Sequence, residues 1–285
     1  MEVTTRGFVF KETESEQKCP DCGRNIIIAT VFGSPYRKLC VCEEAKLQQI
    51  KQRDTLKGID LYREQMRENS GLDGIWLERS LETFRPRTGQ KEAADAARDF
   101  ILRHINKYKI QETDERGKET NSFNFKGLLV IGSTGCGKTH LAVAIANAII
   151  RDADISDEDA EKAGRLGITQ YTANPVKFTN VVTLLQTVKA SFSRNDISSE
   201  EIIRPFQTTG VLILDDLGAE KTSEWTQERI YEIVEYRNNH KKPMIITSNL
   251  KPADLQTWLG DRTYDRVRET CKLVIITAGG QRVTA

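Results

Sequence analysis

The sequence of 285 residues contains no apolar run close to the ~20 residues that a transmembrane helix requires. Its first residues lack the basic start and the apolar stretch of a secretory signal peptide. The net charge is only +1, so the chain has no overall attraction to nucleic acid, and DNA binding would require a local surface. Internal repeats are also absent. These absences predict a compact cytoplasmic protein without a membrane partner.

Cysteine is scarce outside one short segment, in which four of the six cysteines lie. Such a cluster in a cytoplasmic protein favours a bound metal over disulfides. The stretch Cys19-Pro20-Asp21-Cys22-Gly23 predicts a knuckle that turns two thiolates towards one ion. The spacing C-x2-C-x17-C-x-C favours a closed structural zinc site, with an iron–sulfur cluster or unmetallated thiols as alternatives. The predicted zinc ligands are Cys19, Cys22, Cys40 and Cys42, whereas Cys136 and Cys271 are expected to be packing residues.

The composition changes along the chain and indicates domain boundaries. From Glu43 to about Glu68 the sequence is rich in Lys, Gln, Glu, Arg and Leu and lacks Pro, which predicts a polar connecting helix. Asn69-Ser70-Gly71 breaks this helix. We therefore predict a metal-binding module over residues 1–48, a helical linker over 49–70 and a larger domain over 71–285.

Short apolar strands alternate with helices in the larger domain. The expected strands are 127–131, 176–178, 211–214, 244–247 and 273–277, and the expected helices are 90–108, 138–150, 181–192 and 223–239. Apolar strands separated by helices predict an α/β fold with a parallel sheet that helices cover on both faces. The segment 152–161 has six acidic residues in ten and is expected to be a solvated surface insertion without a chemical role.

The run Gly132-Ser133-Thr134-Gly135-Cys136-Gly137-Lys138-Thr139 matches the phosphate-loop pattern G-x-x-x-x-G-K-[ST]. Its glycines let the backbone turn its amides towards phosphate groups, and the helix that follows adds the positive end of its dipole. Lys138 is expected to bind the terminal phosphates, and the hydroxyl of Thr139 is expected to bind magnesium. Because the motif follows an apolar strand and opens an apolar helix, it predicts a site for ATP and magnesium.

Two further strands end in polar residues that suit this site. Asp215 and Asp216 follow an apolar strand, and they would lie at the sheet edge where ligands bind. Asp215 is expected to hold magnesium, and Asp216 is expected to orient or deprotonate the attacking water. Asn249 follows the next apolar strand and would hold that water or the terminal phosphate. The alternative for Asn249 is an N-cap of a helix that starts near Pro252.

These motifs together resemble the AAA+ superfamily, in particular the DnaC/DnaI-type bacterial helicase loaders and the IstB transposition helpers. The resemblance covers roughly residues 70–285. The matching residues are GSTGCGKTHLA (Gly132–Ala142), VLILDDLGAE (Val211–Glu220), ITSNL (Ile246–Leu250), DRTYDRVR (Asp261–Arg268) and the closing Gly279-Gly280-Gln281-Arg282. His140 joins the expected nucleotide-binding set through this match.

The resemblance implies roles for three arginines. Arg262, with Arg266 as the second candidate, matches the arginine that reaches the ATP of a neighbouring subunit, and an ATP-dependent homo-oligomer follows from that role. Arg282 matches a sensor of the terminal phosphate within one subunit. Such arginines stabilise charge on the transferring phosphoryl group. The alternative for Arg262 and Arg266 is a solvated helix face, and the alternative for Arg282 is a charged residue in a tail. The chain ends three residues after Arg282, so we expect no C-terminal helical lid, which fits the loaders and counts against DnaA-like initiators.

The resemblance also implies a function. It predicts an ATPase that loads a DnaB-type replicative helicase onto single-stranded DNA, and Asp216 in place of the usual Glu predicts slow hydrolysis. An N-terminal zinc module is typical of the DnaI-type loaders, which use it to grip the helicase. The alternatives are an IstB-like helper of a transposase and a low-turnover ATP-dependent switch. The helix 181–192, with Lys189, Phe192 and Arg194, is the candidate DNA surface, although core packing explains Phe192 almost as well.

Overall fold

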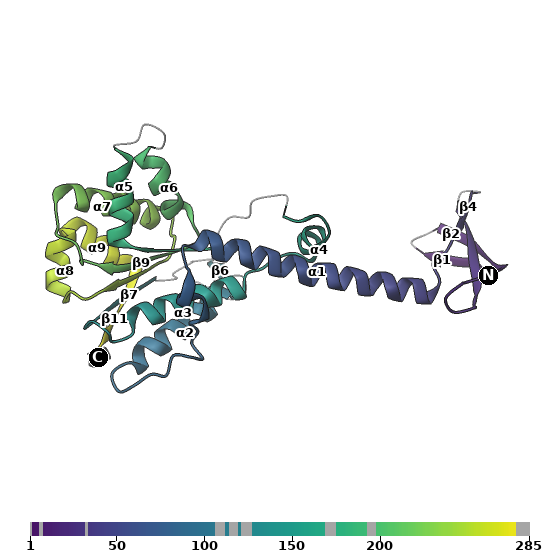
Figure 1. Cartoon of the computed structure of the whole chain (residues 1–285), viewed down its shortest axis with the longest axis horizontal. Coiled ribbons are helices and arrows are strands. Elements are labelled where there is room, and N and C mark those ends of the chain that lie inside the picture. The colour runs from purple at the N-terminus through teal and green to yellow at the C-terminus, as the bar shows by residue number, and fades with distance from the viewer. Residues whose placement is uncertain are drawn as a thin grey trace. The chain divides into compact units, whose positions relative to one another are not determined.

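A computed structural model describes residues 2–5, 8–31, 34–105, 112–113, 119–120, 127–168, 175–192 and 198–277 (Figure 1). Arg194, Arg282 and the closing Gly279-Gly280 pair lie outside these described residues. Contacts divide the chain into two units, which are Met1–Tyr62 with Ile155–Gln170 and Arg63–Asp154 with Tyr171–Ala285. Within the described ranges, no helix is long and apolar enough to cross a membrane.

The first unit contains a small antiparallel sheet in the order β1-β2-β3-β4. Its strands are Glu2–Thr5, Phe8–Lys18, Asn25–Val31 and Ser34–Arg37. Ile26 and Ala29 of β3 are buried, but the sheet is too small for an apolar core that would stabilise it alone. The helix α1 (Val41–Ser70) follows the sheet and continues into the second unit.

The acidic insertion contains a helix that the sequence patterns do not predict. This helix, α4 (Asp157–Leu166), exposes the acidic side chains of its first turn, as expected of a solvated segment. Its small residues pack closely on α1. A Cβ atom on Gly58 would lie 1.8 Å from the Ala160 carbonyl oxygen, and one on Gly164 would lie 1.8 Å from that of Asp54. Glycine at both positions therefore allows the two backbones to touch.

The second unit is built on a parallel sheet of five strands in the order β11-β7-β10-β9-β8. The strands are β7 (Gly127–Gly132), β8 (Val176–Asn180), β9 (Val211–Leu217), β10 (Met244–Ser248) and β11 (Cys271–Ile276). The three inner strands β7, β10 and β9 are almost wholly buried, which explains the apolar runs 128–131, 211–214 and 244–246 within them. The predicted parallel α/β fold is confirmed.

Helices cover both faces of this sheet, with α2 and α3 on one side and α5 to α9 on the other (Figure 1). They are α2 (Lys91–Ile105), α3 (Lys138–Arg151), α5 (Val181–Ser191), α6 (Ser199–Thr208), α7 (Glu224–Asn239), α8 (Pro252–Leu259) and α9 (Asp261–Thr270). A short 3-10 helix, η1 (Gly74–Glu78), precedes α2, and the small strands β5 (Glu112–Thr113) and β6 (Glu119–Thr120) pair with each other. Leu212 and Leu214 of β9 join the apolar cluster beneath α5 to α9.

A buried cation fixes the starts of the two strands that lead to the candidate site. Arg237 of α7 is 0% exposed, and burial lowers the pKa of its guanidinium to about 9. Its two terminal nitrogens donate hydrogen bonds of 2.7–3.0 Å to the carbonyl oxygens of Phe206, Gln207, Thr209, Gly210 and Pro243. Because Gly210 and Pro243 directly precede β9 and β10, this one side chain joins the end of α6 to both strands.

Candidate nucleotide and metal sites

The phosphate loop connects β7 to α3 at the carboxyl edge of the sheet. Gly135 and Gly137 have left-handed φ angles of 77° and 94°, which side chains rarely adopt. A Cβ atom on Gly132 would lie 2.7 Å from the Cys136 sulfur. The loop therefore requires glycine at these positions, and it ends where Lys138 begins α3. The arrangement leaves the positive end of the helix dipole facing the loop.

Lys138 is buried at the mouth of this loop. Its ammonium group donates hydrogen bonds of 3.0 Å to the carbonyl oxygens of Gly132 and Ser133 and one of 2.5 Å to the Oδ1 atom of Asn249. Neutral oxygens thus surround a positive charge that no carboxylate contacts within the part of the chain that the structure describes. An anionic phosphate group is the natural additional partner for this ammonium.

Asp215 lies next to the loop at the end of β9, and its side chain is almost completely buried. The hydroxyl of Thr139 lies 3.0 Å from each of its carboxylate oxygens. Burial raises the pKa of Asp215, against the hydrogen bonds that it accepts from Thr247 and Thr139. A carboxylate beside a hydroxyl, both next to a phosphate loop, is an oxygen donor set that suits magnesium. These two residues would hold the ion and bring it to the terminal phosphates.

Asn249 connects Lys138 to the second carboxylate. Its Nδ2 atom donates a hydrogen bond of 3.1 Å to Asp216 Oδ1, while its Oδ1 atom accepts from Lys138. The capping alternative for Asn249 is wrong, because Lys251 is the N-cap of α8 and no side chain caps that helix. The structure thus brings together the phosphate loop, both aspartates and Asn249, all of which the sequence motifs indicate.

Gln90 contacts the phosphate loop although no motif includes it. Its side-chain amide donates a hydrogen bond of 2.8 Å to the Cys136 carbonyl oxygen, and the Phe84 ring lies 3.1 Å from the position of a Cβ atom on Gly137. His140 makes an edge contact with the same ring, at 5.2 Å between centroids, and burial lowers the pKa of its imidazole. These contacts hold the segment before α2 against the loop. A long-range contact of this kind leaves no periodic signal in the sequence.

The two candidate arginines of α9 have different surroundings. Arg266 forms ion pairs with Glu235 at 3.1 Å and with Glu269 at 3.2 Å. Arg262 is exposed, and its guanidinium carbon lies 5.4 Å from the centroid of the Tyr231 ring. No carboxylate of the described residues pairs with it. Of the two, Arg262 is therefore the one whose charge is available to a phosphate outside its own chain.

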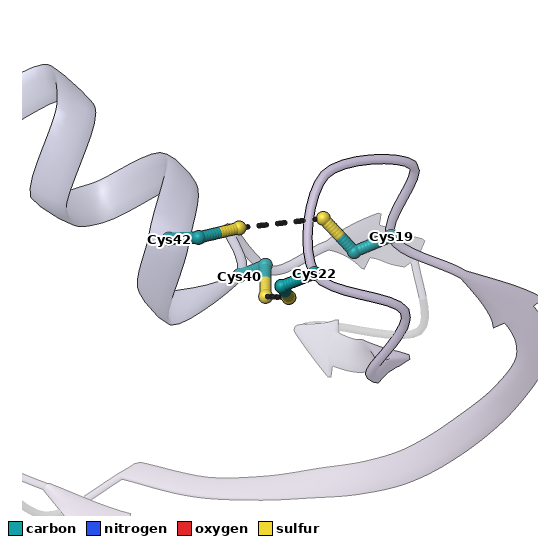
Figure 2. Close-up of side chains that lie close together, drawn as sticks. All are labelled: Cys19, Cys22, Cys40 and Cys42. Carbon is teal, nitrogen blue, oxygen red and sulfur yellow. Dashed lines mark hydrogen bonds between the residues drawn. The ribbon is translucent and has the colours of Figure 1, made fainter.

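The four clustered cysteines form a second candidate site, in the first unit (Figure 2). Their sulfur atoms all lie within 4.8 Å of one another, and none is in a disulfide. The Cys19 and Cys42 sulfurs are 3.4 Å apart, and those of Cys22 and Cys40 are 3.2 Å apart. A tetrahedral zinc site with bonds of about 2.3 Å separates its sulfurs by about 3.8 Å, so small adjustments admit the ion. The donor set therefore fits zinc.

The knuckle expected from the sequence is present. The amide of Gly23 donates a hydrogen bond of 2.9 Å to the Cys19 carbonyl oxygen, and the amide of Cys19 donates one of 2.8 Å to that of Arg24. Gly23 has a left-handed φ angle of 69°, which the tight turn requires. A hydrogen bond from the Arg24 backbone is the main cause that lowers the pKa of Cys22 to about 7, whereas the pKa of Cys42 is raised, mainly by its hydrogen bond with Cys19, and that of Cys40 is also raised. A thiolate is the form that binds metal.

We expect the purified chain to carry about one zinc ion, and chelation to unfold the first unit while ATP binding is retained. The physical reason is that the small sheet lacks a core large enough to fold without the metal. Elemental analysis and circular dichroism before and after chelation measure this. Cys22→Ser is expected to lose the ion, and Cys271→Ser, far from the cluster in sequence, is the matched control. A zinc-free protein, or one with iron–sulfur absorbance, would contradict the assignment.

The phosphate loop, the acidic strand end and the five-stranded parallel sheet define a P-loop ATPase domain of the AAA+ class. Residues 98–273 match the family model of the bacterial DnaA ATPase domain. The chain belongs to this family. The matched family is named for DnaA, whereas the sequence motifs resemble in particular the DnaC/DnaI loader group.

Several similar proteins are helicase loaders. The replicative helicase loader DnaC of Buchnera aphidicola from Acyrthosiphon pisum is 24% identical over 171 residues, which are 60% of this chain and 61% of that protein. The replicative helicase loader DnaI of Bacillus subtilis is 26% identical over 196 residues, 68% of this chain and 52% of the relative. The matches thus span less than two thirds of these relatives. A solved structure of the DnaC helicase loader aligns with a TM-score of 0.52 and 28% identity, covering 72% of this chain and 100% of that one.

Proposed function

We propose that this protein is an ATP-dependent loader that places a DnaB-type replicative helicase on single-stranded DNA. The observation that carries the proposal is the arrangement of donors for ATP and magnesium at the phosphate loop. Lys138 donates to Asn249, Asn249 donates to Asp216, and Thr139 donates to Asp215. It lies on a fold shared with a solved DnaC helicase loader at 28% identity. Hydrolysis of ATP would be slow, because Asp216 is one methylene shorter than the usual Glu.

The N-terminal unit supports a loader over a transposase helper. A four-cysteine cluster followed by the long helix α1 suits a module that grips a partner protein. We propose that the zinc-bound module contacts the helicase. The switch alternative keeps one observation in its favour, since the short carboxylate of Asp216 is held by Asn249. In that version ATP binding alone would control the assembly.

A local surface on the second unit suits single-stranded DNA. Phe192, at the end of α5, is 62% exposed, so the core-packing alternative for this residue is wrong. Its ring makes an edge contact with Trp225 of α7 at 6.2 Å between centroids, and Lys189 Nζ lies 5.0 Å from the centroid of Trp225. Phe192 is exposed, whereas Trp225 is half-buried and packs against the apolar core. An exposed ring next to a cation can stack on a base and pair with phosphates without sequence preference. Trp225 therefore joins Lys189 and Phe192 in the proposed DNA surface.

The test is a loading assay with the replicative helicase of the same host and a closed circle of single-stranded DNA. We expect the chain and ATP together to accelerate helicase binding to the circle. A Phe192→Ala/Trp225→Ala variant should bind the helicase normally but lose about tenfold or more in affinity for the DNA, since each stacked base contributes ~1–3 kcal/mol. Leu166→Ala, an exposed apolar residue on α4, is the control. Binding of a transposase instead of the helicase would favour the IstB-like alternative.

A further inference from the structure

Thr247 lies between the two aspartates, although no motif assigns it a role. It occupies β10 between Ile246 and Ser248 and is 0% exposed. Its hydroxyl accepts a hydrogen bond of 3.0 Å from the backbone amide of Asp216 and donates one of 2.7 Å to Asp215 Oδ1. A hydroxyl has a single proton, so these two bonds use its donor and one of its acceptor sites. One side chain is thereby bound to both acidic residues.

The pairing of β9 with β10 is irregular at this point. Ile246 lies opposite Leu214, and Ser248 lies opposite Leu217, so two residues of β9 face the single residue Thr247. This is a β-bulge, in which Asp215 and Asp216 lie opposite Thr247 alone. Bulges often lie next to active sites, where they redirect a side chain.

The bulge explains how adjacent aspartates can serve one site. In a regular strand, neighbouring side chains point to opposite faces of the sheet. Asp216 instead has a left-handed φ angle of 55°, which turns its carboxylate towards Asn249. The bulge also removes the amide of Asp216 from the regular ladder, and the Thr247 hydroxyl satisfies this amide. Without that hydroxyl, a polar backbone group would lose its partner.

We propose that Thr247 is the positioning residue of the magnesium–ATP site, because its hydroxyl closes the bulge and thereby sets the direction of both carboxylates. The proposal rests on the ATPase function proposed above. Thr139 is itself an expected magnesium ligand, so its contact with Asp215 changes when the ion binds. Thr247 is outside the expected ligand set, so its hydrogen bond to Asp215 would remain when the metal binds. It therefore acts through the two aspartates rather than on ATP.

The test replaces the hydroxyl of Thr247 with a methyl group and retains the volume of the side chain. For Thr247→Val we expect the magnesium concentration at half-saturation to rise about tenfold and kcat to fall about tenfold, because a hydrogen bond to a charged group is lost. Binding of a fluorescent ATP analogue without magnesium should stay within about twofold, since Lys138 and the loop amides are unchanged. Thr247→Ser should restore both magnesium dependence and kcat. Thr226→Val removes another buried hydroxyl, on α7, and should leave the magnesium dependence unchanged.

Wild-type magnesium dependence in a folded Thr247→Val chain would overturn the proposal, as would a serine variant as impaired as the valine variant. If the valine variant does not fold, comparison of Thr247→Ser with Thr247→Ala isolates the hydroxyl in the same way. The readout also separates this proposal from the proposed function. A wild-type chain that binds no ATP analogue contradicts the ATPase function. A wild-type chain that binds the analogue without turnover still reports magnesium dependence, through the tightening of the analogue that magnesium produces.

Discussion

Replacement of Lys138 with alanine is expected to weaken ATP binding by about 100-fold or more and to abolish hydrolysis. Lys138 belongs to the phosphate-loop motif, and the present partners of its ammonium are the neutral oxygens of Gly132, Ser133 and Asn249. ATP would offer it charged oxygens at the same place. The loss of this charge-assisted contact affects binding and the charge that develops during phosphoryl transfer. Equilibrium titration with a fluorescent ATP analogue measures the first effect.

The fold should survive this change. Lys138 is 4% exposed and forms no ion pair with a carboxylate of the described residues, so its removal relieves the cost of burying a charge. The loss of its favourable charge interaction with the buried Asp215 offsets part of this gain. Thermal unfolding of Lys138→Ala without nucleotide should therefore occur near the wild-type temperature, while stabilisation by ATP disappears. Lys221→Ala, on an exposed loop position, is the matched control and should be stabilised like the wild type. Unchanged ATP affinity in Lys138→Ala would refute the phosphate-loop assignment.

The parts of the site that the sequence predicts are those formed by consecutive residues. The phosphate loop is one run of eight residues, and its glycines, lysine and threonine have fixed local roles. Asp215, Asp216 and Asn249 each follow an apolar strand, and parallel strands place such residues at one edge of the sheet. The position of Asn249 beside Asp216 follows from that topology, and the hydrogen bond of 3.1 Å agrees with it.

The parts that the sequence does not predict depend on pairing between distant segments. Gln90 reaches the loop across 46 positions of sequence, and Thr247 reaches Asp215 across 32. The bulge at Asp216 depends on the register of β9 against β10, which no local pattern specifies. In the sequence, Arg237 cannot be told apart from an arginine on the surface of a helix. Its burial is possible because five carbonyl oxygens accept hydrogen bonds from its guanidinium.

The acidic insertion illustrates the same limit. Six acidic residues in ten correctly predict a solvated face, yet the packing of α4 depends on small residues within and just after this stretch. Ala160 and Gly164 are four positions apart on α4 and meet the backbone of α1 at Gly58 and Asp54. Gly164 lowers the helical propensity of α4, so propensity alone does not predict this helix. Tertiary contact between two backbones provides the compensating stability.

Catalysis across subunits is the other large expected effect, and it depends on Arg262. We propose that this arginine completes the ATP site of a neighbouring copy, because it is exposed and lacks an ion-pair partner among the described residues. Hydrolysis would then require contact between chains, so specific activity should rise with protein concentration. Arg262→Ala should bind ATP through its own Lys138 and Thr139 but lose about 1,000-fold in turnover, the typical effect of an arginine supplied in trans.

The decisive experiment mixes two inactive variants, Arg262→Ala and Asp216→Asn. Each lacks a different half of the composite site. Random assembly of equal amounts gives about a quarter of interfaces in which an intact Asp216 meets an intact Arg262 of the next copy. About a quarter of wild-type hydrolysis should therefore return on mixing, although neither variant is active alone. Arg268→Ala, another exposed arginine of α9, is the matched control and should be active by itself.

The alternative outcomes separate three arrangements. If Arg266→Ala rather than Arg262→Ala is rescued by Asp216→Asn, the trans arginine is the second candidate, and its ion pairs with Glu235 and Glu269 must open when the subunits assemble. The pair with Glu269 is exposed and contributes at most about 1 kcal/mol, whereas the pair with Glu235 is half-buried, so its opening would cost more. If no mixture recovers activity and wild-type turnover is independent of concentration, Arg262 is a surface residue. The ATP site is then complete within one chain, and the assembly expected of a loader does not depend on its hydrolysis.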